Sequence, residues 1–100
     1  MHVRVATIQI QSGKMQEAIE LFNKSVVPAQ KAQKGYQGSS LMTDASSGKG
    51  LTTSVWETEA DMLAGESSSG YYQEVIAKFA DLFAEPIVLD HYELSSENSP

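Results

Sequence analysis

Cysteine is absent from this 100-residue chain, which excludes disulfide frameworks, thiolate metal sites and cysteine nucleophiles. Basic residues are scarce as well. Seven lysines and arginines, none adjacent to another, stand against thirteen acidic residues and give a net charge of −6. This charge has the wrong sign for binding a phosphate backbone, so we expect no nucleic-acid partner. The apolar runs are far shorter than the roughly 20 residues of a membrane-spanning helix, so we expect no membrane partner.

Several functional patterns are also missing. No Gly-x-Gly-x-x-Gly or Walker pattern occurs, so the fingerprints of nucleotide- and flavin-binding proteins are absent. His2 and His91 are far apart, and neither has an acidic residue at helical ligand spacing. We therefore expect neither a metal nor another cofactor. The first residues lack the basic and apolar regions of a signal peptide, which favours a cytoplasmic location.

The composition that remains is that of one globular domain, with 41% apolar and 20% charged residues. We expect residues 1–94 to form this domain and residues 95–100 to form a polar, frayed tail. Alternating, β-branched segments predict four strands. The predicted strands are Val3–Ile10, Ser39–Ala45, Leu51–Glu57 and Ile87–Leu94.

Apolar residues at helical spacing predict two helical regions between these strands. The first contains Pro28, which should kink it, and the second is broken over residues 65–70. The spacing of Thr58 and Asp61 resembles a capping box. The residues expected to begin and end the two regions are Ser12 and Gly35 for the first, and Thr58 and Pro86 for the second.

The element order is therefore β-α-β-β-α-β. Right-handed crossovers then give a four-stranded antiparallel sheet with both helices on one face, which is the ferredoxin-like α+β fold.

Apolar residues occupy both faces of the first predicted strand. Val3 and Val5 point to one face, and Ile8 and Ile10 point to the other. Two helices can cover only one face of a four-stranded sheet, and a solvated face should be polar. We therefore expect the chain to form a homodimer through its second sheet face.

Several short motifs, spread over nearly the whole chain, together resemble those of a known protein family. They are Ser12-Gly13-Lys14, Val27-Pro28-Ala29, Lys34-Gly35-Tyr36, Ser54-Val55-Trp56-Glu57-Thr58-Glu59 and Ala84-Glu85-Pro86. With these motifs the chain resembles the antibiotic biosynthesis monooxygenase-like family. The resemblance implies a dimeric α+β barrel, in which two ferredoxin-like sheets face each other. It also implies a pocket between the sheet and the helices of each subunit.

This family is functionally mixed, and a shared fold does not decide among its activities. Some members oxidise aromatic polyketides with dioxygen and no cofactor, and others degrade haem. The haem-degrading branch carries an Asn on the first strand, and a Trp and a His on the second helix. The matching positions here hold Thr7, Gly65 and either Val75 or Ile76. The resemblance therefore argues against haem degradation.

Trp56 and Ser54 share one face of the third predicted strand. Hydroxyl groups beside one aromatic ring suit a cavity that orients a ligand through few polar groups. Trp56 is accordingly either a core or interface aromatic, or the wall on which a planar substrate stacks.

Four further residues are candidates for the site. His91 is the candidate general base, because its ordinary pKa lies near neutrality, although a strand histidine can also be purely structural. Tyr72 lies on an apolar helical stripe, from which its hydroxyl could reach a pocket. Tyr36 follows the helix-ending glycine and could lie over the pocket mouth, and Thr7 is a further candidate contact.

Arg4 lies in phase with Ala6 and Ile8, on a partly apolar strand face. We expect it to pair with Asp90 or Glu93 on a neighbouring strand, or else to meet an anionic ligand.

Two functions remain open from the sequence. The first is a cofactor-independent monooxygenase, or a related small-molecule enzyme, acting on a planar phenolic or enolisable substrate. The alternative is a homodimeric protein without catalysis that binds a metabolite or is associated with stress. A sealed core would favour the second function.

Overall fold

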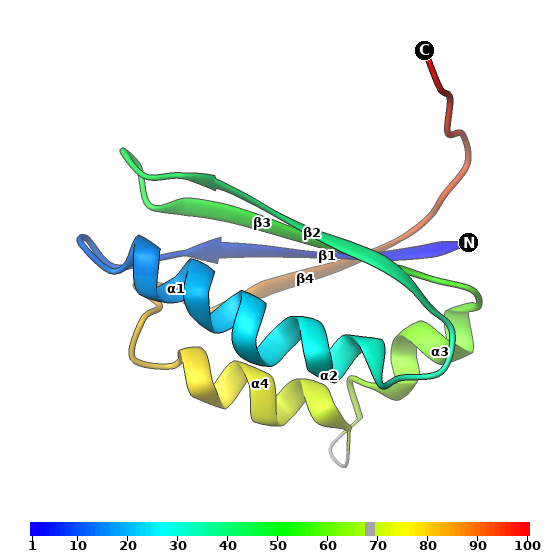
Figure 1. The fold of residues 1–100 in the computed structure, drawn as a ribbon, viewed down its shortest axis with the longest axis horizontal. Coiled ribbons are helices and arrows are strands. Elements are labelled where there is room, and N and C mark those ends of the chain that lie inside the picture. The colour runs from blue at the N-terminus through cyan, green and yellow to red at the C-terminus, as the bar shows by residue number, and fades with distance from the viewer. Residues whose placement is uncertain (68–69) are drawn as a thin grey trace.

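Four antiparallel strands form one sheet, and the helices lie against one face of it (Figure 1). The protein is represented by a computed structural model that describes residues 1–67 and 70–100. The strands are β1 (His2–Gln9), β2 (Tyr36–Asp44), β3 (Lys49–Trp56) and β4 (Val88–Glu93), in the spatial order β2-β3-β1-β4. The helices are α1 (Met15–Leu21), α2 (Val27–Lys31), α3 (Glu59–Ala64) and α4 (Tyr71–Phe79), with a π-helical turn η1 (Phe22–Val26) between α1 and α2.

This arrangement confirms the predicted element order and the ferredoxin-like α+β fold. The strand bounds differ from the prediction by up to three residues, and β2 begins earlier, at Tyr36, with an irregularity between Tyr36 and Gly38. The predicted break over residues 65–70 includes Ser68 and Ser69, which lie outside the described residues.

The strand register decides which side chains face the helices. Ala6 pairs with Thr52 of β3 and Leu89 of β4, and Arg4 pairs in the same way with Ser54 and His91. Because side chains alternate along a strand, the even-numbered residues of β1 and β3 lie under the helices. The buried cluster that results consists of Ile8, Ile10, Ala18, Phe22, Val26, Val75, Phe79 and Leu82.

The opposite face of the sheet, which we call the open face, carries no helix (Figure 1). Val88 is 53% exposed and Tyr92 56% exposed on this face. The strand alternation places further apolar residues beside them, namely Val3, Val5, Met42, Leu51 and Val55. The helices thus cover only one of the two apolar faces.

The helix starts are only partly as predicted. Thr58 is the N-cap of α3, and its hydroxyl oxygen accepts a hydrogen bond from the N–H of Asp61 at 3.0 Å. Ser12, in contrast, does not cap α1. The chain turns through Gly13 at a φ of +79°, and the helix begins after Lys14, whose side chain makes no capping bond.

Pro28 is accommodated by the π-helical turn that precedes it. Proline has no N–H to donate to the carbonyl of Lys24, so the regular α-helical ladder is interrupted here. At the residue just before Pro28, the N–H of Val27 donates to the carbonyl of Phe22, five residues before it, in place of the usual four. The expected disturbance near Val27 therefore takes the form of a wider helical turn.

The predicted end of α4 before Pro86 is wrong, because the helix ends at Phe79. The segment after it pairs with the end of β1. Gln11 N–H donates to the carbonyl of Leu82, and Ala84 N–H donates to that of Gln9, both at 2.8 Å. These bonds direct backbone groups toward the sheet that would otherwise extend the helix.

Within residues 1–67 and 70–100, no helix is both long enough and apolar enough to span a membrane.

Candidate functional site

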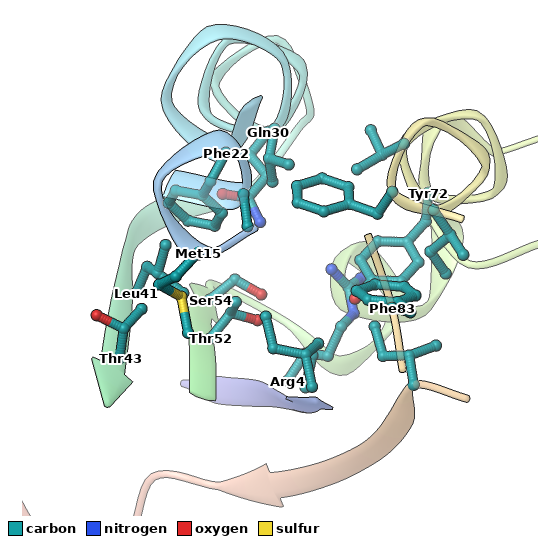
Figure 2. Close-up of a pocket in the computed structure, with 18 residues that line it drawn as sticks. Arg4, Met15, Phe22, Gln30, Leu41, Thr43, Thr52, Ser54, Tyr72 and Phe83 are labelled. Carbon is teal, nitrogen blue, oxygen red and sulfur yellow. The ribbon is translucent and has the colours of Figure 1, made fainter. Parts of the chain in front are cut away.

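A cavity of about 40 Å³ lies between the sheet and the helices (Figure 2). Its floor is formed by β1, β2 and β3, and its walls by α1, α2 and α4. Most of the lining is apolar, and the aromatic rings of Phe22, Phe79 and Phe83 contribute to it. The polar residues in the lining are Arg4, Gln30, Thr43, Thr52, Ser54 and Tyr72.

The size of this cavity limits what it holds without rearrangement. A water-sized molecule needs about 10–15 Å³ of such volume. The cavity therefore has room for a few molecules of the size of water or dioxygen. A polycyclic ligand requires the side chains of the wall to move, since typical ligand pockets measure about 300–1,000 Å³.

The Arg4 side chain rises from β1 and is buried at one side of the cavity, with 2% exposure. Its Nε donates to Glu66 Oε2 at 2.8 Å and its Nη1 to the Tyr71 hydroxyl at 3.2 Å. Its Nη2 donates to the main-chain carbonyl of Met62. A buried guanidinium needs such partners, because an uncompensated charge is costly away from water.

Two aromatic rings complete the surroundings of this cation. The guanidinium carbon lies 4.6 Å from the centre of the Tyr72 ring and 5.3 Å from that of Trp56. Both distances are within the range of cation–π attraction. Trp56 is fully buried, and its indole N–H donates to Ser54 Oγ at 3.0 Å. We call Arg4, Trp56, Glu66, Tyr71 and Tyr72 the Arg4 cluster.

Glu66 connects the Arg4 cluster to His91. The Nε2 atom of His91 lies 2.8 Å from Oε2 and 2.9 Å from Oε1 of this carboxylate. The His91 side chain is 36% exposed, whereas that of Glu66 is 16% exposed and that of Arg4 1% exposed. A single carboxylate thus joins a buried cation to a histidine at the protein surface.

Burial and charge shift the pKa values in the Arg4 cluster. Burial lowers the pKa of Arg4, but the hydrogen bonds to Glu66 and Tyr71 and the nearby negative charge outweigh it, so the net shift is upward. Burial raises the pKa of Tyr71, and Arg4 opposes part of that rise. Burial likewise raises the pKa of Tyr72, to about 12. At neutral pH the cluster therefore presents a cation and neutral phenols, all of which are hydrogen-bond donors.

The described residues contain no group of three or more His, Cys, Asp or Glu side chains that could hold a metal ion.

The family model described as antibiotic biosynthesis monooxygenase matches residues 1–78, which is most of the chain. The chain belongs to this family. No curated protein matches the sequence.

Solved structures of low sequence identity share the fold of this family member. A monooxygenase from the ActVA-Orf6 gene of Streptomyces coelicolor, in complex with nanaomycin D, has a TM-score of 0.83 at 14% identity, over 99% of this chain and 91% of that one. A mutant of SnoaB, a cofactor-independent oxygenase from Streptomyces nogalater, has a TM-score of 0.78 at 9% identity, over 96% and 94%. A protein of unknown function from Nitrosomonas europaea has a TM-score of 0.78 at 16% identity, over 99% and 93%.

The structure brings two of the predicted site residues, Ser54 and Tyr72, into the cavity lining of this monooxygenase-family chain. Trp56 lies behind them, against Arg4. The ring of Tyr36 meets that of Trp56 edge to face at 5.7 Å, and its hydroxyl pairs with Ser39 at 2.8 Å, outside the lining.

Thr7 and His91 are not part of the cavity lining. Thr7 is exposed on the open face, where it contributes to a shallow groove with Met42 and Val88. His91 lies on the helix-covered face but at the sheet edge, where Glu66 separates it from Arg4.

Sequence reasoning missed the partners of Arg4. The expected pairing with Asp90 or Glu93 is wrong, because Asp90 alternates to the open face and Glu93 pairs with His2 in the register. The partner, Glu66, is 62 residues away in a segment that the sequence presented only as a helix break. One indication that Arg4 is buried was present in the sequence: it lies on the same strand face as the core residues Ala6 and Ile8.

Tyr72 should make folding stability depend on alkaline pH. The unfolded chain titrates near the ordinary pKa of 10.0 and the folded chain near 12. The neutral phenol is therefore favoured by folding, so its contribution is complete below pH 10 and is lost as the pH rises toward 12. Over this interval we expect the free energy of unfolding of the wild-type protein to fall by up to about 3 kcal/mol more than that of Tyr72→Phe. Urea unfolding at pH 9 and 11.5 measures the difference.

Identical pH dependence of wild type and Tyr72→Phe would contradict the burial of a neutral Tyr72 phenol.

Proposed function

We propose that the protein is a cofactor-independent monooxygenase that oxidises a planar phenolic or enolisable substrate in the cavity between sheet and helices. The observation that carries the proposal is the membership of this chain in the antibiotic biosynthesis monooxygenase family, together with an apolar cavity beside a buried cation. The likeness to the fold of SnoaB, a cofactor-independent oxygenase, supports it further.

The reaction needs only groups that this chain can supply. A base removes a proton from an activated CH₂ carbon, and the resulting electron-rich carbanion reduces dioxygen. One oxygen atom becomes the new carbonyl oxygen and the other leaves as water, with the substrate supplying all the electrons. An apolar site favours this sequence, because it excludes water that would return the proton.

The Arg4 cluster would stabilise the charge that develops on the substrate oxygen. Arg4 is a fixed cation in the cavity lining, and the Tyr72 phenol is a neutral donor at the pH of the reaction. Donors that are already in place act most strongly where water is excluded.

His91 is the base in this proposal. A proton on Nε2 would be held by Glu66 and would leave Nδ1 as the acceptor. Because His91 lies outside the cavity lining, the reacting carbon would be at the cavity edge near Glu66, with the rest of the substrate inside.

The small volume of the cavity favours a second candidate function. At about 40 Å³ the cavity is nearly filled by side chains, as expected for a homodimer that has no catalytic activity, whether it binds a metabolite or is associated with stress. The monooxygenase requires that a planar substrate opens the cavity and is then oxidised, whereas the second function involves no oxidation.

Oxygen consumption with a panel of anthrones tests the enzyme directly. We expect wild-type protein, with a metal chelator present and no added flavin, to consume oxygen well above the rate of spontaneous oxidation. His91→Gln should lower kcat about a hundredfold, because it removes the base. Tyr72→Phe should lower kcat by a similar factor, because it removes an oxyanion donor.

Tyr92→Phe is the control and should keep the wild-type rate, because its ring lies on the open face, across the sheet from the cavity. Oxygen consumption no faster than the spontaneous rate with every anthrone would favour the second function. Full activity in His91→Gln would exclude this histidine as the base.

The proposal includes a homodimer formed through the open face. That face exposes apolar side chains on several strands, and burying them against a second copy would stabilise both subunits. A dimer of this kind would also leave the helix-covered cavity of each subunit accessible from its own helical side.

Sedimentation equilibrium at low micromolar concentration tests this assembly. We expect wild-type protein at twice 10.9 kDa and Val88→Lys with Tyr92→Lys near 10.9 kDa, because two charges would then lie in the interface. Leu63→Lys is the control, since Leu63 is an exposed apolar residue on α3, on the helical side. Wild-type protein at 10.9 kDa, or a lysine variant that remains dimeric, would contradict the proposed interface.

A further inference from the structure

The Gln30 side chain is buried in the helical wall of the cavity without its full set of hydrogen bonds. It is 3% exposed, and its Oε1 has no hydrogen-bond partner in the part of the chain that the structure describes. It also lines the cavity. Figure 2 shows its amide reaching down from the helix toward Ser54 on β3, beside the ring of Phe22. A buried acceptor without a partner is destabilising, so its position in a cavity wall calls for a reason.

The π-helical turn places Gln30 in this wall. The buried residues of α1, η1 and α2 are Ala18, Phe22, Val26 and Gln30, each four residues after the last. In a regular α-helix, twelve residues turn about 120° beyond three full turns, so Gln30 would leave the buried face. The wider turn of η1 takes up part of this rotation, since it holds more residues per turn. Turns of this kind are frequent at functional sites.

We propose that the Gln30 amide is the specificity determinant of the cavity and binds the hydroxyl group of an aromatic ligand. A hydroxyl can donate to Oε1, so a phenol or an enol supplies the hydrogen bond that this buried acceptor lacks. The rings of Phe22, Phe79 and Phe83 in the same lining provide apolar contacts for a planar ligand. Ser54 is less suited to this role, because its Oγ already accepts from Trp56.

This inference rests on the proposed function only in placing the ligand in the same cavity, and it narrows the substrate class to one with a ring hydroxyl. It concerns binding and not oxidation. The two proposals can therefore be tested with different probes.

Phenol and toluene form a matched pair of probes, because they differ only in a hydroxyl in place of a methyl group. Phenol is also the smallest aromatic ring that carries a hydroxyl group, so it requires less movement of the cavity wall than a polycyclic ligand does. We expect wild-type protein to bind phenol about tenfold more tightly than toluene, although toluene is the more hydrophobic probe. Titration of ¹⁵N-labelled protein measures both dissociation constants. Phenol, but not toluene, should shift the side-chain amide signals of Gln30.

Gln30→Met keeps the length of the side chain and removes the amide. We expect this variant to bind toluene at least as tightly as phenol, and to unfold a few degrees higher than wild type without ligand, since the unpaired acceptor is gone. Gln33→Met is the matched control. Gln33 lies two residues after the end of α2 and outside the cavity lining, and its Nε2 donates to the carbonyl of Ala29. This control should keep the tenfold preference for phenol.

Equal binding of the two probes by wild type, or no binding of either at millimolar concentration, would overturn the inference. A preference for phenol that persists in Gln30→Met would also overturn it. If Gln30→Met does not fold, the wild-type preference and the Gln30 amide shifts decide. A preference for phenol without oxidation of any anthrone would support the role of Gln30 in binding and contradict the proposed oxygenase activity. Oxidation of an anthrone without a preference for phenol would support the oxygenase activity and contradict the role of Gln30.

Discussion

The buried guanidinium of Arg4 is the interaction on which the rest of this structure depends. A cation with 2% exposure is tolerated only where every side of it is compensated. Its partners come from β3, from α3, from α4 and from Glu66 in the segment between these helices. Satisfying one side chain of the first strand therefore fixes where the second half of the chain lies on the sheet. That placement in turn defines one side of the cavity.

Two of the polar residues that line the cavity, Arg4 and Gln30, differ in whether the fold supplies their hydrogen-bond partners. The charge of Arg4 is compensated by the Glu66 carboxylate and by further hydrogen bonds, so it stabilises the fold beside the cavity. Gln30, held in the facing helical wall by η1, has an acceptor that the fold leaves unpaired. A ligand with a hydroxyl group would donate a hydrogen bond to Gln30 Oε1, and it would occupy the same cavity that Arg4 lines. The proposed chemistry and the proposed selectivity thus follow from one arrangement.

The sequence was sufficient for the fold because the signals were local and regular. Strand alternation and the capping Thr58 each act within a few residues, and each is where it was expected. The predicted helix end at Gly35 is wrong, because α2 ends at Lys31 and Gly35 turns the chain into β2 at a φ of +83°. The site was less accessible, because it depends on deviations from regularity. A strict 3.6-residue period places Ala29 on the buried face, whereas η1 brings Gln30 there. Glu66 gave no local sign that it would pair with Arg4, since charge pairing over 62 residues is fixed only by the complete fold.

The energetic coupling between Arg4 and Glu66 is the most direct test of this account. Unfolding free energies of wild type, Arg4→Met, Glu66→Gln and the double variant form a double-mutant cycle. We predict a coupling of about 2 kcal/mol, with Glu66→Gln alone less stable than the double variant, because it leaves the buried cation unpaired. The exposed pair Lys14–Glu17, at 3.4 Å, should show less than about 0.5 kcal/mol in the same experiment. Additive effects at Arg4 and Glu66 would contradict the central role of this ion pair.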